Sequence, residues 1–184
     1  VLEDLSGTEV LGFRAPSFSI VPGLEWALDV LLEEGYAYDS SLFPIRRPDY
    51  GYPGIPRDHH WMDRPGGRIA QFPPATLQAG LRLPAAGGGY LRLLPPGLVH
   101  AALRQAERRG VPGTFYIHPW ELDPEQPRFP VSRATRVRHY GGLGRTAGRV
   151  ENLLAEFNFG TIADTMRSMT EAKSAAALQG GLLG

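Results

Sequence analysis

The chain has 184 residues, and its 19 Lys and Arg residues balance 19 Asp and Glu residues, so that the formal net charge at pH 7 is zero. This length and an ordinary apolar content predict one globular domain and exclude a disordered chain, while the balanced charge gives no indication of a nucleic-acid partner. The lack of cysteine excludes disulfides, thiolate nucleophiles and Cys-ligated zinc, and no apolar run reaches the roughly 20 residues that span a bilayer.

The first part of the chain alternates between predicted strands and helices. Residues 10–13 predict a short strand that ends at a polar residue, Arg14. Apolar residues then recur at helical spacing, which predicts a helix over 22–35 with a glycine at its end. A second strand is expected over 37–42, with Asp39 inside it.

A long region rich in proline and aromatic residues follows. Residues 44–65 lack any period and predict a long ordered loop, a feature that is often functional. Residues 68–72 predict a strand. The glycines of 87–90 predict a flexible or tightly turned segment, whose backbone comes close either to a ligand or to another loop.

The second half of the chain continues the alternation. We expect an amphipathic helix over 95–109, a buried strand over 114–117 that ends at His118, and a helix over 149–157. Thr161, three residues before an aspartate, resembles the start of a capping box for a last short helix.

This order of elements predicts parallel β/α units, in which chemistry sits where strands end and loops begin. Arg14, Asp39 and His118 occupy such positions. We predict that residues 1–170 form one portion of a single domain and that residues 171–184 are a frayed tail.

Each of these three residues has a functional and a structural interpretation. His118 could protonate a leaving amine, or it could be a hydrogen-bonded histidine at a strand end. Asp39 could hold an imidazole in the correct tautomer, or it could be a turn or cap residue. Arg14 could clamp a carboxylate with its guanidinium, or it could form a surface ion pair.

Other candidates are weaker. His59 and His60 are adjacent on an extended chain and therefore point apart, which disfavours a shared metal. Glu121 and Asp123 could form the carboxylate pair of a glycosidase, but their position on a loop defines no geometry. His139 could line a cleft or serve only in packing.

Three segments together resemble the NodB homology region of polysaccharide deacetylases. Residues 12–20 (Gly-Phe-Arg-Ala-Pro-Ser-Phe-Ser-Ile) resemble its third motif, residues 35–44 resemble its fourth, and residues 116–124 (Tyr-Ile-His-Pro-Trp-Glu-Leu-Asp-Pro) resemble its fifth. Further segments are similar to the subgroup of that family found with bacterial exopolysaccharide and PEP-CTERM sorting loci, which has a C-terminal extension; these segments are 72–76, 87–95, 126–128 and 138–140. The resemblance spans roughly residues 3 to 160.

The resemblance implies an α/β fold that is the C-terminal part of a NodB-type deformed (β/α)7 barrel with a long loop insertion. It also implies a metal-dependent hydrolase that removes N-acetyl groups from the amino sugars of an exopolysaccharide. His118 would be the general acid, Arg14 would orient and tune the catalytic base, and Asp39 would orient His118. The residues that we predict to bind the polysaccharide substrate are Trp120, Tyr90, Tyr50 and Tyr52.

The chain departs from the family pattern in one respect. The metal ligands of the family, one Asp and two His, and its catalytic Asp lie in motifs that precede the Arg-x-Pro motif, and this chain has neither an Asp-Asp pair nor a His-x-x-x-His pattern. We therefore predict an N-terminally truncated member, with no metal ligands of its own. Zinc or a similar divalent metal would belong to the full-length parent, and the chain alone would be inactive and poorly stable.

Two alternatives stay open: a non-catalytic carbohydrate-binding remnant that uses the aromatic loop and, less favoured, a glycoside hydrolase. The expected partner is a polysaccharide, with no nucleic acid and no membrane span. The oligomeric state and the compartment stay open, with the cytoplasm slightly favoured.

Overall fold

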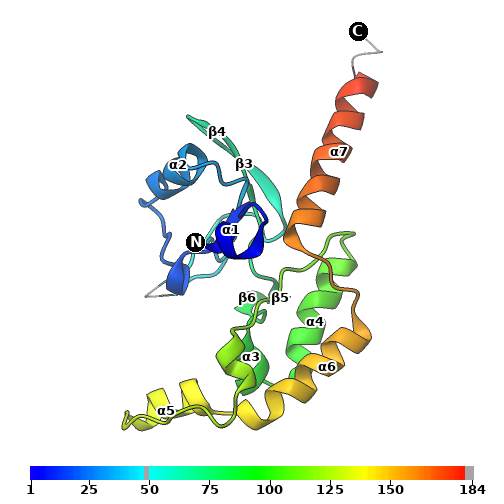
Figure 1. Cartoon of the computed structure of the whole chain (residues 1–184). Coiled ribbons are helices and arrows are strands. Elements are labelled where there is room, and N and C mark those ends of the chain that lie inside the picture. The colour runs from blue at the N-terminus through cyan, green and yellow to red at the C-terminus, as the bar shows by residue number, and fades with distance from the viewer. Residues whose placement is uncertain (48–49, 181–184) are drawn as a thin grey trace.

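The structure is a computed structural model that describes residues 1–47 and 50–180 (Figure 1). Its helices are α1 (Leu2–Ser6), α2 (Trp26–Glu33), α3 (Gly88–Leu93), α4 (Pro96–Glu107), α5 (Arg133–Tyr140), α6 (Thr146–Glu156) and α7 (Ile162–Gly180), with short 3₁₀ turns η1 (Pro16–Phe18), η2 (Pro119–Leu122) and η3 (Leu143–Arg145). Its strands are β1 (Gly12–Phe13), β2 (Tyr38–Asp39), β3 (His60–Arg64), β4 (Gly67–Gln71), β5 (Thr76–Ala79) and β6 (Leu81–Pro84).

Four strands form one sheet in the order β1-β2-β4-β3. Strands β1, β2 and β4 run parallel, whereas β3 is antiparallel to β4. Strands β5 and β6 form a separate hairpin. The mixed α/β class predicted from the sequence is thus confirmed, but no sheet within residues 1–47 and 50–180 closes into a barrel.

Helix α2 packs on this sheet and forms the first core. Its side chains Leu28 and Leu31 are buried together with Ile69 of β4. The predicted helix over 22–35 is confirmed but begins later, at Trp26. Gly35 follows it with φ of 83°, the left-handed conformation expected of a glycine at a helix end.

The prediction of one loop over 44–65 is wrong at its end. Residues 60–64 form β3, which pairs with β4 in a hairpin whose last register pair is Arg64 with Gly67. Gly67 has φ of 141°, a conformation that favours glycine, and it allows the tight turn between the two strands. Pairing with β4, rather than an apolar period, makes this segment a strand.

Helices α3, α4 and α6 enclose the second core, which contains Leu91, Val99 and Leu153. The predicted inner face of α4 is confirmed, since all its members are buried: Val99, Ala102, Leu103 and Ala106. Residues 87–90, predicted to be flexible or tightly turned, are helical from Gly88, which begins α3. The helix expected over 149–157 corresponds to α6.

The predicted strand over 114–117 does not form. Thr114 makes only an isolated parallel bridge with Pro74, and its carbonyl oxygen accepts a hydrogen bond from the backbone N–H of Ala75 at 2.9 Å. Pro73 and Pro74 have no N–H to donate, so a ladder on this side stops after one bond. The segment still leads into His118, as expected.

An aromatic cluster connects the two cores. Phe18 and Phe43 form its buried centre, with Tyr50, Tyr90 and Tyr116 packed around them. Phe18 has φ of 53°, which is unusual for a residue with a large side chain. This conformation accompanies contacts of its ring with the rings of Phe43 and Tyr116, at centroid distances of 5.1 and 5.3 Å.

Helix α7 points away from the rest of the chain in Figure 1. Its capping box is confirmed, since Asp164 N–H donates to Thr161 Oγ1 at 3.1 Å and Thr161 N–H donates to Asp164 Oδ2 at 3.4 Å. The helix extends to Gly180, and the rest of the predicted frayed tail, 181–184, lies outside the described residues. No helix of the described chain is long and apolar enough to span a bilayer.

Candidate functional site

His118 stands at the start of η2, with its side chain 57% exposed. Pro119 takes the first helical position, and Glu121, at the third, reaches back to cap the turn. Glu121 Oε2 accepts a hydrogen bond from the His118 backbone N–H at 3.0 Å and lies 3.3 Å from His118 Nδ1. One carboxylate therefore fixes both the backbone and the ring of this histidine.

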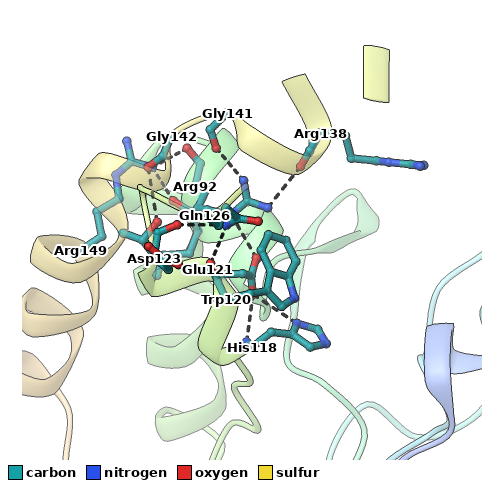
Figure 2. A network of polar contacts seen from close by, with 12 residues as sticks. Arg92, His118, Trp120, Glu121, Asp123, Gln126, Arg138, Gly141, Gly142 and Arg149 are labelled. Carbon is teal, nitrogen blue, oxygen red and sulfur yellow. Dashed lines mark hydrogen bonds and ion pairs between the residues drawn. The ribbon is translucent and has the colours of Figure 1, made fainter. Parts of the chain in front are cut away.

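Glu121 is itself held by a buried ion pair with Arg92 of α3. Both side chains are 2% exposed, and Arg92 Nε donates to Glu121 Oε1 at 3.0 Å. The remaining guanidinium nitrogens donate to the carbonyl oxygens of Gly141 at 2.6 Å and Arg138 at 3.2 Å (Figure 2). These bonds join α3, η2 and the C-terminal end of α5 around one guanidinium.

The glycines before α3 allow this close packing. A Cβ atom on Gly88 would lie 1.9 Å from Glu121 Oε2, and one on Gly87 would lie 2.6 Å from the Tyr116 ring. The predicted close approach of this backbone is thus confirmed, and the neighbour is the segment over 116–121.

We expect Gly88→Ala to lower the free energy of unfolding by about 1–3 kcal/mol, because its methyl group would overlap a carboxylate that Arg92 holds in place. Gly89→Ala is the matched control in the same helix: nothing lies within 4 Å of its Cβ, and we expect it to be neutral or stabilising by about 0.5 kcal/mol. Urea unfolding followed by circular dichroism measures both. Equal stabilities of the two variants would contradict the packing described here.

Arg14 lies just after β1 and faces the same aromatic ring that His118 contacts. Its Nε donates to the Ser40 carbonyl oxygen at 3.0 Å and its Nη2 donates to Ser40 Oγ at 2.6 Å. Its guanidinium carbon lies 4.8 Å from the centroid of the Tyr116 ring, and that centroid lies 5.7 Å from the centroid of the His118 ring. Burial lowers the pKa of Arg14 and raises the pKa of Tyr116 to about 12. Arg14 and His118 therefore both contact the ring of Tyr116.

Asp39 has a different position from the one predicted. It is fully buried, and its carboxylate accepts hydrogen bonds from the backbone N–H and the hydroxyl of Ser41. Burial raises the pKa of Asp39, although the bonds from Ser41 and the charge of Arg14 oppose this shift. The carboxylate that contacts the His118 ring is that of Glu121, so the expectation that Asp39 orients His118 is corrected.

The aromatic residues predicted to bind substrate lie in three different parts of the structure. Trp120 lies beside His118 in a pocket of roughly 270 Å³, and its ring stacks on that of His139 with 4.4 Å between centroids. The hydroxyls of Tyr90 and Tyr50 lie 2.7 Å apart in the aromatic cluster that also includes Tyr116.

Tyr52 lies in the first core instead and donates a hydrogen bond from its hydroxyl to Glu25. Neither Tyr52 nor its partner lines the pocket that contains His118.

Sequence reasoning did not assign Arg92 or Glu121 to the site. Glu121 carries a signal, because a carboxylate three residues after a helix-starting position is the pattern of a capping box. Arg92 carries no such sequence signal, since its partner is 29 residues away.

Glu121 and Asp123, considered as a glycosidase pair, have different surroundings. Glu121 is buried in the ion pair, whereas Asp123 is exposed and accepts a hydrogen bond from the Glu125 backbone.

The described residues contain no group of three or more His, Asp or Glu side chains that could hold a metal ion. His59 and His60 separate as expected from their adjacency: the His59 ring stacks on Phe72, whereas His60 Nδ1 lies 2.9 Å from the Asp58 carbonyl oxygen.

Comparison with known proteins gives one match. No curated protein and no solved structure matches the chain. A family model described as a domain of unknown function, DUF3473, matches residues 40–167, from just after β2 to the start of α7, and includes His118, Glu121 and Arg92. Since this match covers more than half of the chain, the protein belongs to the DUF3473 family.

Proposed function

We propose that this chain supplies the general acid of an N-deacetylase site. In this site His118 protonates the amine that leaves when an acetyl group is removed from an amino sugar. The observation that carries this proposal is the anchoring of an exposed imidazole by a buried carboxylate. Nδ1 of His118 faces Glu121, and no hydrogen bond joins Nε2 to any described residue. A histidine held in this way by Nδ1 can give and take a proton at Nε2.

The Arg92–Glu121 pair suits this role. The guanidinium of Arg92 donates to Glu121 Oε1 and so fixes the position of the carboxylate that contacts His118 Nδ1. Because the proton is transferred at Nε2 while Nδ1 stays bonded, the ring keeps its orientation throughout.

The order of the resembling motifs supports a NodB-type deacetylase as the parent enzyme. We propose that the open sheet is the later part of its (β/α) barrel. In that site Arg14 and His118 both contact the ring of Tyr116. Arg14 would orient and tune a catalytic base by hydrogen bonding from its guanidinium.

The divalent metal implied by the resemblance does not fit the residues described. They include no cluster of three ligating side chains, and His59 and His60 face different neighbours. The proposal for this chain is therefore limited to the proton transfer at His118 and to the binding of the sugar.

A second candidate is carbohydrate binding without catalysis. The stack of Trp120 on His139 in an open pocket favours it, because a flat aromatic surface beside polar groups suits a sugar ring. This candidate requires no proton transfer by His118.

The test is acetate release. The polypeptide encoded by the complete reading frame that contains this chain would be incubated with N-acetylated chitohexaose and zinc or cobalt, and free acetate would be measured. We expect acetate without new reducing ends. Sugar binding without acetate would favour the second candidate, and new reducing ends would show a glycoside hydrolase.

A further inference from the structure

Positive charge is concentrated in one segment of this neutral chain. Residues 126–150 contain six arginines, one histidine and no Asp or Glu, although the whole chain has as many acidic as basic side chains. Acidic residues resume on either side of this segment, at Glu125 and Glu151. Such a block of like charge on a folded segment attracts anions.

This segment forms an arm beside the proposed site. Helix α5 projects from the rest of the molecule in Figure 1. Thr135, Arg138 and His139 of this helix line the same pocket as His118 and Trp120. Figure 2 shows that the Arg138 side chain extends away from the Arg92 network, to which only its carbonyl oxygen contributes.

Most of these arginines are not used inside the protein. Arg149 donates to carbonyl oxygens at the end of α3, including that of Leu94 at 3.1 Å. In contrast, Arg133, Arg136 and Arg138 are exposed, and their side chains form no ion pair with any residue that the structure describes. Three guanidinium groups on a helix of eight residues are therefore available to a ligand.

We propose that α5 binds the carboxylates of an acidic polysaccharide while a neighbouring N-acetylated sugar occupies the pocket that His118 and Trp120 line. This inference rests on the proposed function and adds the class of polymer. The planar guanidinium forms paired hydrogen bonds with a carboxylate. Arg133 and Arg136 are three residues apart and share one face of the helix. Arg138, about 7.5 Å along the axis from Arg133, lines the pocket instead.

A polysaccharide fits this arm better than a membrane surface does. A helix that lies on a membrane needs an apolar face opposite its charges. On α5 the exposed apolar side chains are those of Ala134 and Val137, which form no broad apolar face, and the large ring of Tyr140 is buried. One of these arginines, Arg138, also lines a pocket with an aromatic stack, which suits a sugar.

The test compares two hexasaccharides by titration of tryptophan fluorescence with the 184-residue chain. A hyaluronan hexasaccharide alternates an N-acetylated amino sugar with a uronate, whereas N-acetylated chitohexaose, in which every amine is acetylated, is neutral. We expect the hyaluronan fragment to bind about tenfold more tightly at low salt and to lose this advantage as salt is added. Equal affinities for the two probes would overturn the proposal.

Variants locate the effect. Arg133→Gln, Arg136→Gln and Arg138→Gln together should remove the preference for hyaluronan and keep binding of N-acetylated chitohexaose. Arg108→Gln, at an exposed position directly after α4, should change neither. An unchanged preference in the triple variant, with the fold verified by circular dichroism, would also overturn the proposal. So would binding to phosphatidylglycerol vesicles, but not to hyaluronan, by the unaltered chain.

The two proposals fail differently. Preferential binding of hyaluronan without acetate release by the complete polypeptide would refute the deacetylase and leave the acidic-polymer site. Equal acetate release from acidic and neutral polymers, unaffected by the triple variant, would refute the acidic-polymer site alone.

Discussion

Arg92→Met is expected to lower the free energy of unfolding by about 3–5 kcal/mol, because it leaves the carboxylate of Glu121 buried without its ion partner. The same change removes the hydrogen bonds that the guanidinium donates to the carbonyl oxygens of Gly141 and Arg138. Urea unfolding followed by circular dichroism measures the loss.

Two controls separate the buried charge from the general effect of losing an arginine. Arg64→Met removes a partly exposed ion pair with Asp29 and should cost about 1 kcal/mol or less. The double variant Arg92→Met with Glu121→Leu removes both charges and should recover part of the stability that Arg92→Met loses. The interpretation fails when Arg92→Met costs no more than Arg64→Met.

His118→Asn is expected to lower the rate of acetate release by the complete polypeptide about 10²–10⁴-fold, because asparagine cannot donate a proton to the leaving amine. Binding of the sugar should change little, since the Trp120 and His139 rings remain stacked. The measurement is the initial rate of acetate release at saturating oligosaccharide, with the dissociation constant determined separately.

The matched control is His100→Gln. His100 lies on α4, where its Nδ1 lies 2.6 Å from Glu156 Oε2, and it does not line the pocket of His118. We expect its variant to keep the full rate. Full activity in His118→Asn would remove the acid from the proposed mechanism.

The sequence predicted those elements whose apolar period is clear. Helix α4 and its buried face follow from the spacing of Val99, Ala102, Leu103 and Ala106. Helix α5 was missed because its eight residues are mostly charged or polar, and it begins only where Ser132 caps it through the Thr135 N–H. The β5–β6 hairpin was missed because its two strands are defined by pairing with each other, which no local sequence pattern shows.

The candidate site, too, was predicted only in part. His118 and Trp120 were found because polar and aromatic residues after an apolar segment suggest a strand end, even though no strand formed there. Arg14 and His118 both contact the Tyr116 ring, but Asp39 was assigned a partner that Glu121 has instead. The Arg92–Glu121 pair depends on the tertiary contact of α3 with η2 at Gly88, and no local pattern encodes that contact.

The three contacts of Arg92 also have a dynamic consequence. Because one guanidinium binds η2, the end of α5 and the following glycine, displacement of any of these segments exposes charges that are otherwise shielded from water. Local opening of the three segments is thereby coupled into one cooperative unit. His118 stands at the start of η2, so an opening of this unit would separate its imidazole from the carboxylate that now faces Nδ1.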